Sequence, residues 1–170
     1  MQEILKSRVF AFVAGIVFIV LDQAVKILCL THLKTNSFRA GGDFLSFDIE
    51  LHHNPGAFLS LGASLPPQLK QLIFIAGVSI VICWATYWAF SHWYKSIKHA
   101  LPIYFIALGG ASNLIDRIFR DGHVVDYMIL SIGPIHTGVF NIADIAITVG
   151  AIALAIDIFA KQRTTSKTSE

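Results

Sequence analysis

Four apolar stretches of membrane length constrain this chain more than any other feature. A run of about 18 apolar residues is enough to cross the hydrocarbon core of a bilayer. Leu72–Phe90 meets that length without a charged side chain, and residues 9–30, 100–116 and 139–160 are apolar over most of their length. Charged residues make up only 14% of the chain, against roughly 25% in soluble domains. We therefore expect an all-α membrane protein with four transmembrane helices at about these positions.

Lys and Arg residues are spread unevenly over the segments that flank these spans. Seven lie in the short segments before the first span, between the second and third, and after the fourth. Five lie in the loops 31–71 and 117–138, which are together more than twice as long. Because cytoplasmic segments are enriched in Lys and Arg, we expect cytoplasmic termini and two loops outside. The predicted organisation is one membrane domain over 1–160 and a disordered cytoplasmic tail over 161–170.

The first long loop contains a pattern typical of a strand. Apolar and polar side chains alternate between Leu45 and Leu51, as they do in a half-exposed β-strand. A small extracytoplasmic β element is therefore expected above the helices. In the second loop, VVDYMIL (124–130) is consistent with either a strand or a short buried turn.

Four aspartates lie in or beside the apolar stretches: Asp22, Asp116, Asp126 and Asp144. A carboxylate at membrane depth costs a few kcal/mol, so it is a functional candidate. Packing alone does not require so many, and the question is which of them perform chemistry and which hold structure.

Two of these aspartates have a cation close by in the sequence. Asp22 and Lys26 have the i, i+4 spacing and the orientation of a helical ion pair. Asp116 is followed by Arg117, and Asn113 lies one turn earlier. The simpler interpretation of both aspartates is structural: an ion pair in the first span and a polar network at the end of the third.

Asp126 and Asp144 lack such a neighbour. Asp126 lies among apolar residues, and Asp144 opens the fourth span with Asn141 three residues earlier as a possible cap or partner. If the two carboxyl groups meet, they can share one proton and act as general base and general acid, as in an aspartic protease. Alternatively, Asp144 only caps the helix and Asp126 is bound in its loop. Spacing alone leaves both interpretations open.

Other chemistries have less support in the sequence. The outer histidines lack a metal-binding spacing, no phosphate-binding loop or basic nucleic-acid patch is present, and no metal or cofactor is expected. The small residues from Gly109 to Ser112 favour close helix packing. A transporter or assembly factor that uses the aspartates as a proton or ion relay is the alternative from another class. The histidines considered are His52, His53, His123 and His136.

Five motifs occur in an order that is specific when taken together: DQAVK (22–26), NPGAFLS (54–60), NLIDR (113–117), VVDY (124–127) and FNIAD (140–144). On these motifs the chain resembles the lipoprotein signal peptidase (signal peptidase II) family of bacterial membrane aspartyl proteases, from about residue 20 to residue 155.

The resemblance implies a function and a set of site residues. It implies an endopeptidase that removes the signal peptide of prolipoproteins by cutting just before a diacylglyceryl-modified cysteine, and that the antibiotic globomycin blocks. It implies Asp126 and Asp144 as the catalytic pair, a β-cradle, and a site near the outer face of the bacterial cytoplasmic (inner) membrane. The expected partners are the lipidated substrate and membrane lipid, without nucleic acid, for a monomeric enzyme. The implied site-shaping residues are Asp22, Lys26, Asn54, Gly56, Asn113, Asp116, Arg117, Asn141 and Ala143.

The chain departs from the family pattern at three places. An aromatic residue is shifted by one position at Phe58–Leu59, Ser112 replaces a glycine, and Tyr127 replaces a phenylalanine. These changes concern the contact of the loop with lipid or substrate, the helix geometry near Ser112, and a hydroxyl added near Asp126.

Overall fold

The structure is a computed structural model, and it describes residues 2–56, 64, 66, 68–69 and 72–167. The shifted residues Phe58 and Leu59 lie outside the described residues, and so does the end of the predicted tail, 168–170. The predicted division of the chain at residue 160 stays a prediction, and α5, the last helix, continues to Lys167.

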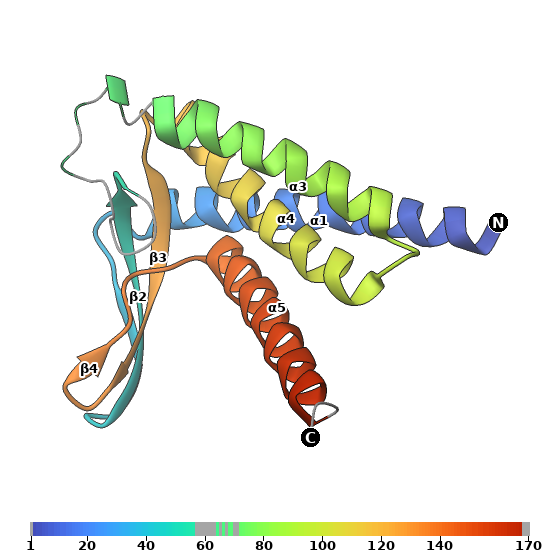
Figure 1. Ribbon diagram of the computed structural model, residues 1–170. Helices are drawn as coiled ribbons and strands as arrows, with labels where there is room; N and C mark the ends of the chain where they lie inside the picture. The colour runs from blue at the N-terminus through green and yellow to red at the C-terminus, as the bar shows by residue number, and fades with distance from the viewer. Residues whose placement is uncertain (1, 57–63, 65, 67, 70–71, 168–170) are drawn as a thin grey trace.

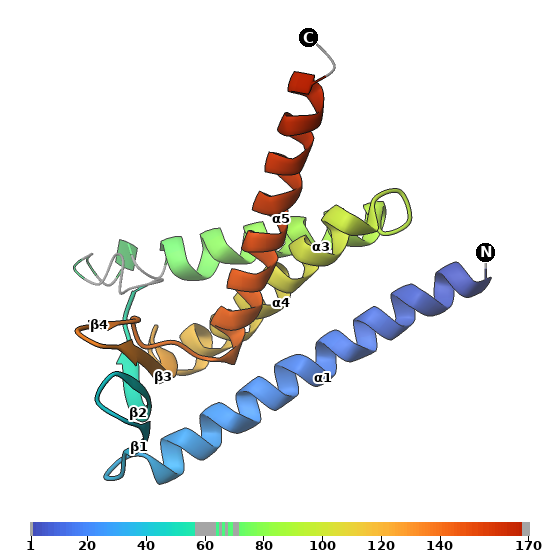
Figure 2. The same ribbon diagram turned by 90° about the horizontal axis from the view of Figure 1, so that it is seen from below.

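Each of the long helices has one end close to a small sheet (Figure 1). The chain enters α1 far from the sheet, and its C-terminal end reaches the sheet, as does that of α4. The N-terminal ends of α3 and α5 also lie near the sheet, so both chain termini lie away from it (Figures 1 and 2). The helices are α1 (Gln2–His32), a π-helical turn η2 (Leu72–Gly77), α3 (Val78–His92), α4 (Ile97–Phe119) and α5 (Ile142–Lys167).

Three of the four predicted spans are long and apolar enough to cross a membrane: Arg8–His32, Ile75–His92 and Ile142–Ala160. The predicted span 100–116 lies within α4, which is not among these three. Helix α4 packs against α1, α3 and α5. A helix that is enclosed by its neighbours contacts less lipid. It can therefore carry polar side chains, which lower its mean hydropathy.

The four strands form one antiparallel sheet in the order β1-β2-β3-β4, so the molecule is mostly helical rather than all-α. The alternating segment forms β2, as predicted, and the undecided segment 124–130 is part of β3. Strands β2 and β3 pair directly, which means that the two long loops build a single element. The strands are β1 (Phe38–Gly41), β2 (Leu45–Asn54), β3 (Val124–Ile132) and β4 (Ile135–His136).

Glycines bring α4 and α5 into close contact, as the small residues of the third span predict. A Cβ atom added at Gly109 would lie 2.3 Å from the backbone oxygen of Ala143, and one at Gly150 would lie 2.5 Å from that of Pro102. Either substitution would force the two helices apart. The first contact holds the start of α5, and therefore Asp144, against the sheet end of α4.

Candidate active site

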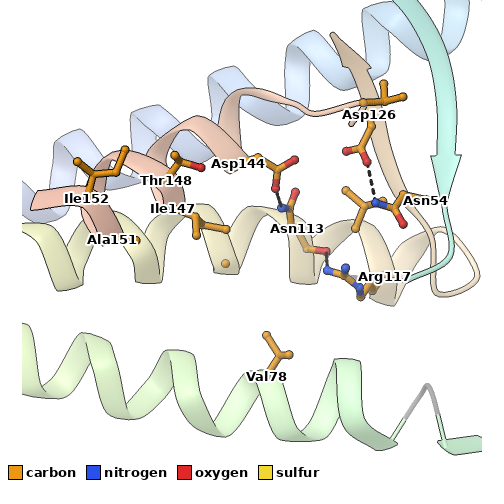
Figure 3. A pocket seen from close by; sticks show the side chains of 13 residues that line it. Asn54, Val78, Asn113, Arg117, Asp126, Asp144, Ile147, Thr148, Ala151 and Ile152 are labelled. Atoms are coloured by element: carbon orange, nitrogen blue, oxygen red, sulfur yellow. Dashed lines mark hydrogen bonds between the residues drawn. The ribbon is translucent and has the colours of Figure 1, made fainter. Parts of the chain in front are cut away.

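Asp126 of β3 and Asp144 in the first turn of α5 line the same cavity, of about 430 Å³, which we call the dyad cavity. Their carboxyl groups face the same space between the sheet and the helices (Figure 3). Its polar end is formed by Asn54, Asn113 and Arg117, and apolar residues of α3 and α5 line the remainder. The two aspartates that have no adjacent cation in the sequence are thus brought together by the fold. The apolar lining includes Val78, Ile147, Ala151 and Ile152.

Asn141 positions both aspartates. Its side-chain oxygen accepts a hydrogen bond from the backbone N–H of Asp144 at 2.9 Å, and the Asp144 carboxylate accepts one from the N–H of Asn141 at 3.2 Å. This reciprocal pair is a capping box, which confirms Asn141 as the cap of the helix. The amide group of Asn141 also donates to Asp126 at 2.7 Å. One residue therefore ties the carboxyl groups of β3 and α5 together.

Among the described residues, side-chain amides donate hydrogen bonds to both carboxyl groups. Asp126 accepts from Asn54 at 2.9 Å in addition to Asn141, and Asp144 accepts from Asn113 at 2.8 Å. A contacting cation would strongly favour the ionised carboxylate. An amide fixes the position of the carboxyl group with a smaller effect on its charge, so the protonation of the pair can change during a reaction.

The pKa of Asp126 is raised to about 6, mainly by burial and also by the negative charge of Asp144, while the hydrogen bonds from Asn54 and Asn141 act to lower it. The side chain is almost completely buried, with 2% of its surface exposed. Asp126 can therefore exchange a proton close to neutral pH, which is the property that general acid–base chemistry requires.

A second cluster of charged groups is centred on Lys26 of α1. Its ammonium group lies 2.9 Å from Asp22, Asp116 and the side-chain oxygen of Asn113, so all three of its hydrogen-bond donors have an acceptor. Lys26 and both aspartates are fully buried. The predicted Asp22–Lys26 ion pair is confirmed, and it extends to an aspartate that lies far away in the sequence.

Asp116 lies in a polar network at the end of α4, as predicted, but its contacts differ from those that the sequence suggests. It pairs with Arg120 as well as Lys26 and accepts a hydrogen bond from the backbone N–H of Val125 at 3.1 Å. Arg117 instead donates to the backbone oxygen of Gly56 at 2.6 Å and to that of Asn113 at 3.2 Å. Arg117 thereby holds Gly56, two residues after β2, against α4, and its positive charge acts on Asp126 and Asp144.

The two clusters are parts of one network, and Asn113 links them. Its side-chain oxygen accepts from Lys26 and, at 3.1 Å, from Asn141, while its amide donates to Asp144. Asp22 accepts from the backbone N–H of Ala143 at 3.2 Å, next to Asp144. Asn54 accepts from the N–H of Gly56 at 3.0 Å. All eleven residues that the sequence predicts for the site therefore belong to one hydrogen-bonded network.

Sequence reasoning missed three members of this network. Gln23 donates to Asp116 at 2.8 Å and to Ser112, Arg120 pairs with Asp116, and Ser112 donates to Asp22 at 2.6 Å. The i, i+4 spacing of Asp116 and Arg120 is a signal that could have found the second. Ser112, noted only as a departure from the glycine pattern, adds a hydroxyl that bridges α4 and α1.

The hydroxyl of Tyr127 does not join the site. Successive residues of a strand point to opposite faces, and Tyr127 packs with Cys29, Leu33 and Val125 on the face toward α1. Asp126 points the other way, into the dyad cavity. The expected effect of this hydroxyl on Asp126 therefore has no direct contact to support it.

The outer histidines make local contacts. His52 lies 2.5 Å from Glu50, and the rings of His53 and His123 meet edge to face with centroids 6.5 Å apart. In the part of the chain that the structure describes, no three His, Cys, Asp or Glu side chains are arranged to hold a metal ion.

A helical membrane fold with two amide-held aspartates in one cavity is the arrangement expected of a membrane aspartic peptidase. The family model described as signal peptidase (SPase) II matches residues 14–160. The chain belongs to the signal peptidase II family, whose members are aspartic peptidases.

Relatives and solved structures agree with this assignment over nearly the whole chain. The lipoprotein signal peptidase of Syntrophus aciditrophicus is 30% identical, covering 91% of this chain and 94% of that protein. Those of Cellvibrio japonicus and Borrelia duttonii are 31% and 32% identical, each over about nine tenths of both chains. A bacterial membrane enzyme solved by the in meso method at 2.3 Å has a TM-score of 0.75 and 25% identity, covering 90% of this chain and 89% of the other.

Proposed function

We propose that this lipoprotein signal peptidase uses Asp126 and Asp144 as its catalytic dyad and cuts prolipoproteins just before a diacylglyceryl-modified cysteine. The observation that carries the proposal is the Asn141 bridge. It holds one carboxyl group from β3 and one from α5 at the polar end of a cavity whose remaining walls are mainly apolar. A peptide bond next to a membrane-embedded helix fits such a cavity.

The dyad acts on water and on the scissile peptide bond. One carboxylate takes a proton from a water molecule whose oxygen attacks the carbonyl carbon, while the protonated partner donates a proton to the carbonyl oxygen. The C–N bond then breaks and the leaving amine takes up a proton from the dyad. Because the two groups titrate as a pair, the roles of base and acid belong to the dyad and not to one named residue.

The remaining network residues support the dyad. Asn54, Asn113 and Asn141 orient the carboxyl groups, Arg117 fixes the segment around Gly56, and the contact of Asp22 with Ala143 fixes the start of α5. Lys26 and Asp116 join α1, α4 and β3. The chain's own side chains are sufficient for this chemistry, and we propose that no metal or cofactor takes part.

We further propose how the protein lies in its membrane. Four helices, including α4, cross the bacterial cytoplasmic (inner) membrane with both termini in the cytoplasm, and the sheet lies at the outer face. The distribution of Lys and Arg supports this orientation, as does the position of both termini away from the sheet. The dyad then lies near the outer interface, where water can reach it and the lipidated substrate can enter from the bilayer. We propose a monomer that globomycin inhibits.

A cleavage assay with a lipidated preprotein in detergent tests this function. Asp126→Asn and Asp144→Asn are each expected to abolish cleavage while thermal unfolding of the purified protein shows a retained fold. Cleavage at the wild-type rate by either variant would refute the dyad. A proton relay would instead couple transport to a proton gradient and tolerate Asp144→Glu, a variant that is expected to be inactive as a peptidase because it moves the carboxyl group.

A further inference from the structure

Asp144 lines a second cavity, of about 270 Å³, on a neighbouring face of α5. This cavity, which we call the lateral cavity, lies between α5 and residues 137–140, the segment that leads from β4 to the helix. It shares Val139, Asp144 and Thr148 with the dyad cavity. These three residues therefore form a wall with one cavity on each side, and one of the two aspartates belongs to both.

The two cavities differ in chemistry. The dyad cavity has Asn54, Asn113 and Arg117 at its polar end, where the groups of a peptide backbone can find hydrogen-bond partners. The lateral cavity is lined mainly by apolar side chains, among them Phe140 and the half-exposed Ile145 and Val149. It suits a flexible hydrocarbon chain that needs no hydrogen bond.

The proposed reaction requires two apolar groups close to one peptide bond. The signal peptide lies on one side of the cut, and the acyl chains of the modified cysteine lie on the other. Both groups stay in the hydrocarbon, and both begin within a few residue lengths of the carbonyl carbon under attack. Two cavities that meet at Asp144 provide a separate place for each group.

We propose that the lateral cavity receives an acyl chain of the substrate's diacylglyceryl group, while the dyad cavity takes the signal peptide around the scissile bond. This inference rests on the proposed function. Since lipid tails are as apolar as the cavity walls, the acyl chain gains little hydrophobic free energy on entry. The cavity acts by shape: it fixes the modified cysteine and thereby aligns the scissile bond with the dyad.

A bulky side chain in the lateral cavity tests this assignment. Val149→Trp is expected to lower kcat/KM about tenfold for a substrate with two palmitoyl chains, because the scissile bond is misaligned. The same variant is expected to cleave a substrate with two butyryl chains within about twofold of wild type. Val149 is 50% exposed, so the larger side chain has room at the surface. The readout is the ratio of the kcat/KM values for the two substrates. The short-chain substrate is the internal control, because its cleavage measures how much of the variant is folded and active.

Ile156→Trp is the matched control, because residue 156 lies two turns further along the same face of α5 and outside the lining of both cavities. It is expected to change neither rate. Equal losses for the two substrates with Val149→Trp, or a loss for neither, would overturn the proposal. Ile152→Trp, which narrows the dyad cavity, is expected to slow both substrates alike.

A labelling experiment does not depend on the tryptophan variant. The inactive Asp126→Asn protein is mixed with a substrate that carries a photoreactive diazirine in one palmitoyl chain, and the labelled residues are found by mass spectrometry. Labels on Phe140, Ile145 or Val149 are expected. Labels concentrated on Val78 or Ala151, in the dyad cavity, would refute the assignment. A failure of the catalytic proposal would appear differently, as cleavage by the Asp126→Asn protein.

Discussion

Two pairs of aspartates in this protein, all buried except the partly exposed Asp144, lie close together and differ in what holds them. Asp22 and Asp116 share the ammonium group of Lys26, which lies 2.9 Å from each. Asp126 and Asp144 are held by the amides of Asn54, Asn113 and Asn141. Asp22, Asp116 and Asp126 are almost completely buried, where an unpaired carboxylate is costly.

The two kinds of partner allow different chemistry. A carboxylate that is paired with a buried cation stays ionised and connects helices, since removing either partner leaves an uncompensated charge. A carboxyl group that is held by amides keeps its place in either protonation state. The first arrangement suits a scaffold and the second suits proton transfer. Four substitutions test this distinction.

Asp126→Asn is expected to lower kcat/KM by at least about a thousandfold, because one half of the acid–base pair is lost. Its stability should not fall. The pKa of Asp126 is raised from 3.8 to about 6, so the folded state binds the proton more tightly than the unfolded chain does. Ionisation of Asp126 therefore lowers the free energy of unfolding. The whole of this loss is present above about pH 6, and none of it is present below about pH 4. Unfolding temperatures at pH 8 and pH 4 should show a gain for the variant that is larger at pH 8.

Lys26→Met is expected to destabilise the protein by about 3–5 kcal/mol, since two buried carboxylates lose their shared cation. Unfolding in mixed micelles with increasing SDS measures the change. Lys34→Met, which removes an exposed cation just after α1, serves as the control and should stay within about 0.5 kcal/mol of wild type. A stable Lys26→Met protein would remove the distinction between scaffold and dyad.

Asn54→Ala is expected to move the pH dependence of cleavage. Activity requires one proton on the dyad and falls as the pair loses it, and the raised pKa of Asp126, about 6, contributes to the midpoint of that fall. The hydrogen bond from Asn54 lowers that pKa, so its loss should shift the falling limb of kcat/KM toward higher pH by about one unit. A profile that keeps its midpoint while its height falls would mean that Asn54 only binds substrate.

Ser112→Ala is expected to have the smallest effect, a loss of about 1–2 kcal/mol in unfolding free energy, because its hydroxyl donates to the buried Asp22 at 2.6 Å. Ser91→Ala, which removes an exposed hydroxyl bonded within its own helix, is the matched control and should be nearly neutral. Equal effects of the two substitutions would show that the departure from glycine at residue 112 has no structural role.

Much of the fold could be predicted because the bilayer and the water around it restrict which residue types each segment can contain. A membrane span needs a long apolar run, and this rule locates α1, α3 and α5. A half-exposed strand alternates between apolar and polar residues, which locates β2. A buried cation four residues from an aspartate forms an ion pair, which identifies the Asp22–Lys26 pair. These rules place a helix at 100–116 as well, within α4, although α4 is not among the three helices that are apolar enough to cross a membrane, because its neighbours enclose it. They also leave β3 undecided, since a strand buried at both faces does not alternate.

The spans, the family motifs and the candidate aspartates can be recognised in the sequence, because each depends on local composition or on short strings of residues. Which groups meet depends on the tertiary structure. Asp116 reaches Lys26 across about 90 positions, Arg117 turns to Gly56, and Asn113 and Asn141 join the scaffold to the dyad. These contacts follow from the close packing of α4 on α5 and from the pairing of β2 with β3, and hydrogen bonds depend on distances of a few ångströms in space that spacing along the chain does not specify.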